Sequence, residues 1–358
     1  MKFLTVIGAR PQFIKAAPLS RALRKKHREI LVHTGQHYDY GMSQQFFKEL
    51  NIPRPDHNLN VGSGLHGAQT AAMLAKLEPV VIRQNPDAII IFGDTNSTLA
   101  GALIAAKLHI PLAHIEAGMR SFNRMMPEEV NRVVADHLSN MHFCSTKTAV
   151  DNLKKEGINS GLYLVGDIMY DAMKSILPSP ARIARIIKGL TLAPKDYLFV
   201  TIHRAENTDN PDNLSAIMEA LISSGKKAVF PVHPRTEKKL KDISLWDKLK
   251  RSENILLIPP QGYRESLALQ SAAYAVITDS GGIQKEAYLL KTHCLTVRHE
   301  TEWVETIKTG WNHLVGPDKK RILKTLAGLK PPSAHPNLYG QGHATRLIVR
   351  HLERHLGR

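Results

Sequence analysis

Cysteine is scarce in this chain of 358 residues, and long apolar runs are missing. The two cysteines, Cys144 and Cys294, each end a separate apolar run and match no metal-ligand spacing, so we predict buried free thiols. No apolar run approaches the roughly 20 residues that span a bilayer. The N-terminal stretch has one lysine and too short an apolar run for a signal peptide. These absences predict a cytosolic protein without a membrane partner.

Acidic residues are too few to balance the basic ones, and the formal net charge is +16. The excess is dispersed, and its densest stretches, RALRKKHRE (21–29) and KKLKDISLWDKLKR (238–251), look like solvated helix faces. No aromatic-interleaved basic motif of the RNA-binding type occurs. We therefore expect no nucleic-acid partner. A small anionic ligand, such as a nucleotide or a phosphate ester, needs only a few local cations.

Short apolar runs alternate with amphipathic stretches in the first half of the chain. Strand, helix and strand in succession predict a parallel sheet with helices on both faces. The helical stretches include 67–84 and 97–107. The predicted strands are 2–8, 29–35, 88–94, 110–116, 141–145 and 162–167.

A second series of the same kind follows the proline-marked segment 166–196, which we predict to be a linker. Its predicted strands are 197–203, 227–233, 254–260, 274–280 and 293–298. The fold class is therefore α/β, with two Rossmann-like doubly wound domains facing each other across a cleft. We predict an N-terminal domain over 1–168 and a C-terminal domain over 169–340. The basic helix near 341–356, within 341–358, is expected to pack back on the first domain.

Polar or glycine-bearing loops follow almost every predicted strand, where ligands bind in such sheets. The first is GARPQFIKAAP (8–18), in which Gly8 permits a tight turn and Pro11 suits the first helical position. Arg10 and Lys15 then lie near a helix N-terminus, which already favours anions. The loop is not GxGxxG, so the dinucleotide fingerprint is absent. A turn with two surface cations is the simpler alternative.

The loop DSGGIQKEA (279–287) is the strongest single motif. Gly281 and Gly282 let the backbone approach a diphosphate closely, and Ser280 adds a hydroxyl donor. Glu286 comes one turn later, where it can reach a ribose hydroxyl. A glycine-rich helix start without a ligand is the alternative.

Histidines follow two neighbouring predicted strands, in VTIHRAEN (200–207) and FPVHPR (230–235). His203, His233 and Arg235 therefore point to one ligand site. No HxH or HxxxH spacing occurs in these loops, so we expect no metal. Tyr263, in PPQGYRES (259–266), suits stacking against a base or bordering it.

Three carboxylates in the first half stand at chemically informative places. Asp94 ends one predicted strand, Glu116 ends another, and Glu128 begins the helix PEEVNRVVADHL. A helical ion pair between Glu128 and Arg132 would explain one of the three, not the other two.

In this order, the motifs resemble the non-hydrolysing UDP-N-acetylglucosamine 2-epimerases. The resemblance runs from residue 3 to beyond 310 and rests on GARPQFIKAAP, GDTNSTLAGALIAA, HIEAGMRS, MPEEVNR, TIHRAEN, PVHPR and DSGGIQKEA. It implies an isomerase of the GT-B type that needs no cofactor, binds a UDP-sugar mainly through its second domain, forms a homodimer and serves polysaccharide biosynthesis. Its implied reaction interconverts UDP-N-acetylglucosamine and UDP-N-acetylmannosamine. UDP leaves, a 2-acetamidoglucal forms, and UDP adds back.

The resemblance also implies roles for individual residues. Asp94, Glu116 and Glu128 match the acid, base and electrostatic positions, and their pKa values must then be held apart. The implied donors to the departing diphosphate are Arg10, His203, Ser280, Gly281 and Gly282. Substrate or nucleotide contacts are implied for Lys15, Arg132, His233 and Glu286.

Some positions depart from the common family pattern. Gln12 stands where glutamate is frequent, and Tyr38 and Ala68 stand where arginine is common. Trp303 follows the residue pair TE, where arginine and proline are common. We do not carry over an allosteric site. The GARPQ and TEWVE forms resemble relatives that epimerise UDP-diacetamido-glucuronic acid, whose carboxylate could pair with Arg204, Arg298 or His299. That substrate is the alternative, and a GT-B glycosyltransferase is the more remote one.

Overall fold

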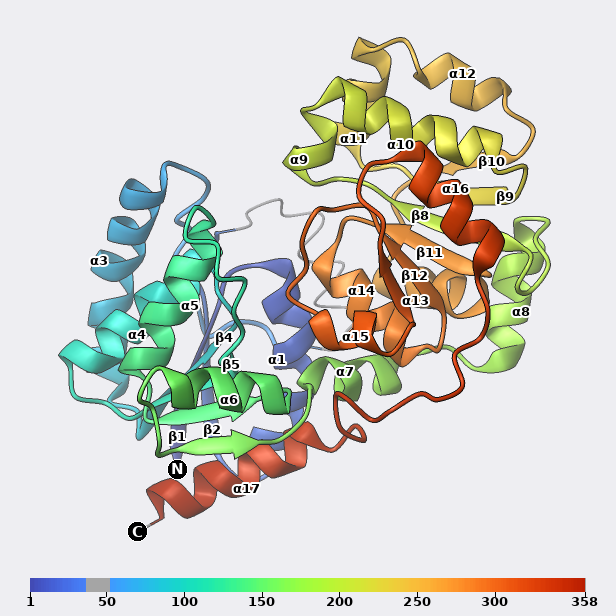
Figure 1. Cartoon of the computed structure of the whole chain (residues 1–358). Helices are drawn as coiled ribbons and strands as arrows, with labels where there is room; N and C mark the ends of the chain where they lie inside the picture. Colours follow the sequence, from blue (N-terminus) through green and yellow to red (C-terminus); the bar gives the residue numbers. More distant parts are fainter. Residues whose placement is uncertain (37–51, 358) are drawn as a thin grey trace. The chain divides into compact units, whose positions relative to one another are not determined.

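The computed structural model describes residues 1–36 and 52–357, with the backbone but not the side chain of Arg10. Contacts between backbone segments divide the chain into two compact units. One comprises Met1–Ile176 and Asn337–Arg358, and the other comprises Leu177–Pro336. Each unit contains a parallel sheet with helices (Figure 1). The predicted α/β class with two parallel sheets is confirmed.

The sheet of the first unit has seven strands in the order β3-β2-β1-β4-β5-β6-β7 within the described residues. Every residue of the central strand sequence AIIIF is buried, because helices cover both faces of the sheet. The strands are β1 (Lys2–Ile7), β2 (Arg28–His33), β3 (His57–Asn58), β4 (Ala88–Phe92), β5 (Leu112–Ala117), β6 (Met141–Cys144) and β7 (Leu162–Leu164).

The helices of the first unit form two groups. Helix α4 contacts α3 and α5, whereas α1 contacts α7 and α17. Right-handed crossovers place α1 and the α4–α5 pair on opposite faces of the sheet. Helix α5 begins with Pro127 and has two glutamates in its first turn, where the helix dipole favours acids. The helices are α1 (Arg10–Leu23), α3 (His66–Gln84), α4 (Asn96–Lys107), α5 (Pro127–Leu138), α6 (Lys147–Lys155), α7 (Ile168–Ile176) and α17 (Ala344–Leu356).

The sheet of the second unit has six described strands in the order β10-β9-β8-β11-β12-β13. They are β8 (Tyr197–Thr201), β9 (Lys227–Pro231), β10 (Ile255–Ile258), β11 (Ala275–Thr278), β12 (His293–Thr296) and β13 (Asn312–Leu314). The helices are α8 (Pro180–Gly189), α9 (Ala205–Thr208), α10 (Pro211–Ser223), α11 (Pro234–Asp242), α12 (Trp246–Arg251), α13 (Tyr263–Ala272), α14 (Gly281–Leu289), α15 (Val304–Lys308) and α16 (Lys319–Gly328).

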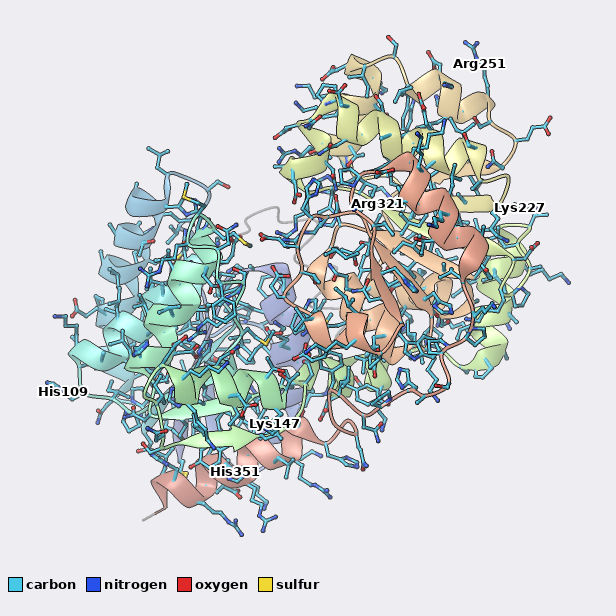
Figure 2. All side chains as sticks on the ribbon, in the orientation of Figure 1. His109, Lys147, Lys227, Arg251, Arg321 and His351 are labelled. Carbon is cyan, nitrogen blue, oxygen red and sulfur yellow. The ribbon has the colours of Figure 1, made fainter. Side chains whose placement is uncertain are left out.

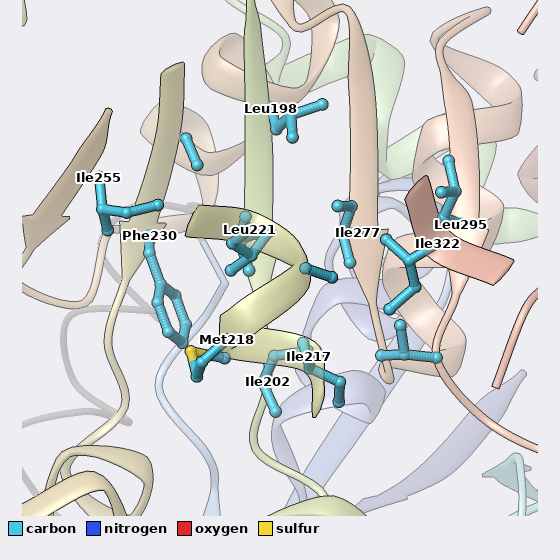
Figure 3. Close-up of a cluster of buried hydrophobic side chains, with 14 of the residues drawn as sticks. Leu198, Ile202, Ile217, Met218, Leu221, Phe230, Ile255, Ile277, Leu295 and Ile322 are labelled. Carbon is cyan, nitrogen blue, oxygen red and sulfur yellow. The ribbon is translucent and has the colours of Figure 1, made fainter. Parts of the chain in front are cut away.

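Apolar side chains from strands and helices together fill the core of the second unit (Figure 3). Leu198 and Phe230 come from neighbouring strands, while Ile217 and Leu221 come from α10, and all four are fully buried. Alternate residues of a strand face opposite sides of the sheet. The strand residues that face the other side of the sheet, among them Tyr197, therefore form a separate apolar cluster with residues of α8, α13 and α14.

Two short strands were not predicted from the sequence. Strands β3 and β13 have only two and three residues and lie at sheet edges, so no alternation of apolar and polar residues is long enough to identify them. The segment 166–196, read as a linker, contains helices α7 and α8. Helix α7 belongs to the first unit, where it contacts α1 and α17.

Basic side chains are spread over many elements, as the labelled Lys147 of α6, Lys227 of β9, Arg251 of α12 and Arg321 of α16 illustrate (Figure 2). Such dispersion agrees with the absence of one basic tract in the sequence. Among the helices that the structure describes, none is long and apolar enough to cross a membrane.

Both cysteines are buried free thiols, as predicted: Cys144 ends β6 and Cys294 lies in β12. Burial raises the pKa of each thiol to about 12, which favours the unreactive protonated form.

We expect a thiol-reactive disulfide reagent to modify the native protein at least about a hundredfold more slowly than the denatured protein. Absorbance of the released thiolate measures both rates. Rapid labelling of two thiols per native chain would contradict this burial.

Candidate functional site

Each sheet has a point at which the strand order reverses, and the polar strand-end residues gather there. In the first sheet β1 lies beside β4, and in the second β8 lies beside β11, with sequence-successive strands running outward on both sides. Neighbouring loops at such a point diverge to opposite faces and leave room for a ligand. The loops after β1 and β4, and those after β8 and β11, are therefore the candidate sites.

The loop after β1 approaches its neighbours so closely that a side chain at Gly8 is excluded. A Cβ atom on Gly8 would lie 2.1 Å from the hydroxyl oxygens of both Thr34 and Ser97. Helix α1 begins two residues later, at Arg10. The anion contact predicted for Arg10 involves a side chain outside the described part of the chain. Tyr38, which stands where arginine is common in the family pattern, also lies outside it.

Gln12 joins the loops after β1 and β4, a role that the sequence reading missed. Its side-chain oxygen accepts hydrogen bonds from the backbone N–H groups of Gly8 and Ala9, at 2.8 and 3.1 Å. Its Nε2 donates to the carbonyl of Phe92 and the hydroxyl of Thr95, at 2.9 and 3.0 Å. An amide fits because it both donates and accepts, whereas an ionised glutamate only accepts. Glutamine at position 12, where glutamate is frequent, therefore suits the donors and acceptors around it.

Glu116 ends β5 in a strained backbone conformation. Its φ of 69° lies in the left-handed region, and the pairing of β5 with β6 skips one residue between Ile115 and Ala117. Such a bulge interrupts the alternation of side chains along a strand and re-aims one of them. The buried Glu116 carboxylate forms an ion pair with Lys15 of α1. The pair lies beside the β4 loop, because a Cβ atom on Gly93 would be 3.4 Å from Glu116 Oε2.

Asp94 follows Gly93 and is held by α5. Its carboxylate forms an ion pair with Arg132, and its carbonyl accepts a hydrogen bond from Asn131 Nδ2 at 3.0 Å. Arg132 does not pair with Glu128 as the sequence spacing allowed. Instead it pairs with Glu129, at 3.1 Å. Glu128 is half-buried in the first turn of α5, and the described residues offer it no hydrogen bond or ion pair.

Glu129 holds the loop that precedes α5, which the sequence reading also missed. Its carboxylate accepts hydrogen bonds from the N–H groups of Ser121 and Phe122 at 2.9 and 3.0 Å. Four contacts from this buried carboxylate, including those to the Ser121 hydroxyl and to Arg132, fix the loop between Glu116 and α5. Spacing along the chain does not distinguish the role of Glu129 from that of Glu128. The two residues differ in the direction of their side chains around the helix.

Asp279 organises the corresponding edge of the second sheet. This fully buried carboxylate follows β11 and accepts hydrogen bonds from the backbone N–H groups of His203 and Arg204, at 3.1 and 3.0 Å. It also accepts one from Asn207 Nδ2 at 3.1 Å. The His203 ring is 41% exposed at its side chain, with Nδ1 3.6 Å from Asp279. A buried carboxylate thus fixes the backbone that presents an accessible imidazole.

The two predicted histidines lie near each other, with ring centroids 6.3 Å apart. His233 caps α11, where its Nδ1 accepts a hydrogen bond from the N–H group of Arg235 at 3.2 Å. The exposed Arg235 guanidinium pairs with Asp209 at 2.5 Å. Their exposure leaves His233 and Arg235 available to a ligand.

Helix α14 begins two residues after Asp279 with the predicted glycine pair. Ser280 makes no side-chain cap, so its hydroxyl does not occupy the N–H groups of Gly281 and Gly282 in the first turn. These N–H groups and the helix dipole favour an anion. The indole Nε1 of Trp303 borders this turn, 3.5 Å from a Cβ position on Gly281, and its ring covers the Lys285 ammonium at 4.1 Å.

Two other predicted ligand residues are buried within the second unit. Tyr263 begins α13 with 2% of its surface exposed, and Glu286 has 4% exposed. Glu286 accepts a hydrogen bond from Gln270 at 2.7 Å. The proposed base and ribose contacts of Tyr263 and Glu286 remain sequence predictions. Among the described His, Cys, Asp and Glu residues, no group of three or more could hold a metal ion.

Two parallel sheets with polar residues at both reversal points are typical of α/β enzymes that bind nucleotides. A family model described as UDP-N-acetylglucosamine 2-epimerase matches residues 21–353. The chain belongs to this family, and it is accordingly an epimerase, an isomerase. The resemblance drawn from the motifs is confirmed.

Individual relatives cover the chain almost completely. The chain is 51% identical over 351 residues to a UDP-N-acetylglucosamine 2-epimerase homolog of Methanococcus maripaludis, with 98% of each covered. It is 44% identical over 364 residues to the UDP-2,3-diacetamido-2,3-dideoxy-D-glucuronate 2-epimerase of Pseudomonas aeruginosa, covering 98% of this chain and 99% of the relative. The crystal structure of the Methanocaldococcus jannaschii UDP-GlcNAc 2-epimerase with UDP-GlcNAc and UDP is similar with a TM-score of 0.90. Its identity is 42%, and coverage is 99% of this chain and 100% of that chain.

The buried position of Gln12 makes a stability prediction. Gln12→Leu removes the acceptor for two N–H groups and leaves them unsatisfied, which should lower the free energy of unfolding by about 1–3 kcal/mol. Urea unfolding followed by far-ultraviolet circular dichroism measures the change. Gln341→Leu, at an exposed site of the same unit, is the control and should stay within about 0.5 kcal/mol. Equal stability of the two variants would contradict the bridging role of Gln12.

Proposed function

We propose that the protein interconverts UDP-N-acetylglucosamine and UDP-N-acetylmannosamine by eliminating UDP and adding it back. The observation that carries the proposal is the Lys15–Glu116 pair at the β5 bulge, beside the turn that presents Asp94. Acids and cations lie there together at the reversal point of a parallel sheet. The solved M. jannaschii relative, whose crystals contain UDP-GlcNAc and UDP, supports the substrate class.

Elimination is the route that these residues suit. The hydrogen on carbon 2 of the sugar is not acidic, so its removal must accompany loss of a leaving group. The C1–O bond breaks with its electron pair going to UDP, a carboxylate accepts the carbon-2 proton, and a C1=C2 double bond forms in 2-acetamidoglucal. Re-addition of UDP at carbon 1, with proton delivery to the other face of carbon 2, gives the epimer.

The first unit would supply the proton-transfer groups. Asp94, Glu116 and Glu128 are the candidate acid, base and electrostatic residues, and they differ in their surroundings. Lys15 and Arg132 compensate the charges of Glu116 and Asp94, whereas Glu128 is half-buried without such a partner among the described residues. Different surroundings are what separates acid from base in enzymes that use several carboxylates.

The second unit would stabilise the departing diphosphate. The uncapped first turn of α14 offers the N–H groups of Gly281 and Gly282 together with the Ser280 hydroxyl, and His203 adds a ring nitrogen. Removal of one such donor typically lowers the rate about a hundred- to a thousandfold. Arg10, through its sequence position, would serve the same group.

UDP-diacetamido-glucuronic acid is the second candidate substrate, and Arg298 is the observation that favours it. This guanidinium is 3% exposed, and its Nε has no hydrogen-bond partner among the described residues, although Glu206 lies 3.8 Å away. A carboxylate on the sugar could complete its bonding. The 44% identical Pseudomonas aeruginosa relative carries that substrate in its name.

Solvent deuterium tests the elimination. Incubation with UDP-N-acetylglucosamine in deuterium oxide should give deuterium at carbon 2 of both epimers, because the proton on that carbon is lost and regained. Proton NMR follows the carbon-2 and anomeric signals. Epimer formation without label would overturn the elimination. No turnover of this sugar, with labelled turnover of the diacetamido-glucuronate analogue, would transfer the mechanism to the second substrate.

Carboxylate variants test the assigned roles. Asp94→Asn, Glu116→Gln and Glu128→Gln should each lower kcat about a hundredfold or more, because each loses a proton-transfer or charge-stabilising group. UDP affinity, measured by titration calorimetry, should change little. Glu78→Gln, at an exposed position of α3, is the matched control with unchanged kcat. Normal turnover with lost UDP affinity in these three variants would contradict the roles.

A further inference from the structure

Strand β5 carries a second ionisable residue, His114, two positions before Glu116. The side chain of His114 is fully buried, so it cannot contact a substrate directly. A buried histidine in a core is ordinary when one nitrogen donates and the other accepts. The contacts of His114 differ from that pattern.

Both ring nitrogens of His114 face groups that only accept. Nδ1 lies 2.7 Å from Asp136 Oδ1, and Nε2 lies 2.7 Å from the carbonyl oxygen of Gly93. A neutral imidazole has one donor and one acceptor nitrogen, whereas an imidazolium has two donors. Hydrogen bonds to both of these acceptors at once would need a ring that donates from both nitrogens, which is the imidazolium.

Asp136 of α5 joins the His114 ring to a cluster of charged side chains. Its second oxygen accepts hydrogen bonds from Arg120 Nη1 at 2.7 Å and from the N–H group of Gly118 at 3.1 Å. Arg120 in turn binds Glu156 through two bonds of 2.7 Å. Burial acts to raise the pKa of Asp136, but His114 and then Arg120 outweigh it, so the pKa is lowered. The His114 ring and the Arg120 guanidinium thus face the carboxylates of Asp136 and Glu156, and His137 lies 3.3 Å from Glu156.

The cluster holds the backbone on both sides of the candidate acids. Gly93, with a φ of 60°, directly precedes Asp94. Its carbonyl accepts from His114, and its N–H group donates to the carbonyl of Ile115 at 3.0 Å. Gly118, two residues beyond Glu116, donates to Asp136. One carboxylate therefore links the turn of Asp94, through the His114 ring, to the segment that follows Glu116.

We propose that His114, as a buried imidazolium, is a positioning residue that fixes the Asp94 turn against the Glu116 bulge. This inference rests on the proposed function, because it assigns the spacing of these two acids to His114 and Asp136. A displacement of about 1 Å at reacting groups can cost about a hundredfold in rate. The effect of His114 should therefore fall on kcat and leave KM nearly unchanged.

Two amide substitutions test the two hydrogen bonds of the His114 ring one at a time. The side-chain nitrogen of Asn can occupy the place of Nδ1, so His114→Asn can keep the bond to Asp136 and loses the bond to Gly93. The longer Gln can place its nitrogen near Nε2, so His114→Gln can keep the bond to Gly93. We expect His114→Asn to lower kcat about 10- to 100-fold and His114→Gln to recover much of that loss. KM for the UDP-sugar should change less than about threefold in both.

His142 provides the matched control. It is the register partner of His114 on β6 and is equally buried, and its Nε2 lies 2.8 Å from the backbone carbonyl of Asp136. No hydrogen bond from His142 to the Asp94 turn is found in the described part of the chain. His142→Gln should therefore destabilise the protein comparably without a selective fall in kcat. An equal fall in kcat for His142→Gln and His114→Asn would reduce His114 to a structural residue.

The charge on the ring has its own readout. In protein labelled with ¹⁵N-histidine, the resonances that disappear in His114→Gln should show protons on both nitrogens at the pH of the assay. A neutral ring, or a normal kcat in His114→Asn, would overturn the inference. If the wild-type protein converts neither UDP-sugar, the proposed function fails and the positioning role fails with it. The NMR result then still decides the charge of the ring.

Discussion

Parallel pairing of neighbouring strands is the constraint on which the rest of this structure depends. Because parallel strands all end at the same edge of the sheet, loops far apart in sequence emerge side by side. The reversal between β1 and β4 brings Gln12 and Lys15 to the turn of Asp94, and that between β8 and β11 brings His203 to Asp279. The same order of strands in each half thus produces a candidate site at each sheet.

Buried polar groups give these edges their geometry. Gln12, Glu129, Asp136 and Asp279 each accept hydrogen bonds from backbone N–H groups of a strand-end loop. A buried polar atom without a partner costs free energy, so each of these side chains holds its loop in a single arrangement. Backbone strain at Glu116, with its positive φ, persists because Lys15 and the neighbouring strands fix the bulge. Positioning and stability are therefore coupled in the first unit.

Membership in the 2-epimerase family sets the reaction class, and we propose that residues around α14 decide between the two candidate sugars. Trp303 over Lys285 and the buried Arg298 line the region around the first turn of α14, where the proposed diphosphate would bind. The relatives include enzymes named for neutral and for acidic sugars. Arg298, whose Nε has no hydrogen-bond partner among the described residues, is the residue on which the proposal of an acidic sugar rests.

The sequence alone determined the fold class, most strands and helices, and the strand-end loops, because apolar periodicity and glycine, proline and capping residues act locally. Helices α3, α4 and α5 begin within a residue of their predicted starts. Only the tertiary structure decided which acids face which cations. Arg132 pairs with Asp94 of the loop after β4 and with Glu129, three residues earlier in α5, rather than with Glu128. His114 joins Gly93 to Asp136 because strand order and side-chain direction bring these residues together. Spacing along the chain leaves these choices open, because positions three and four residues apart are both neighbours on a helix, and the bulge at Glu116 interrupts the alternation of side chains along β5.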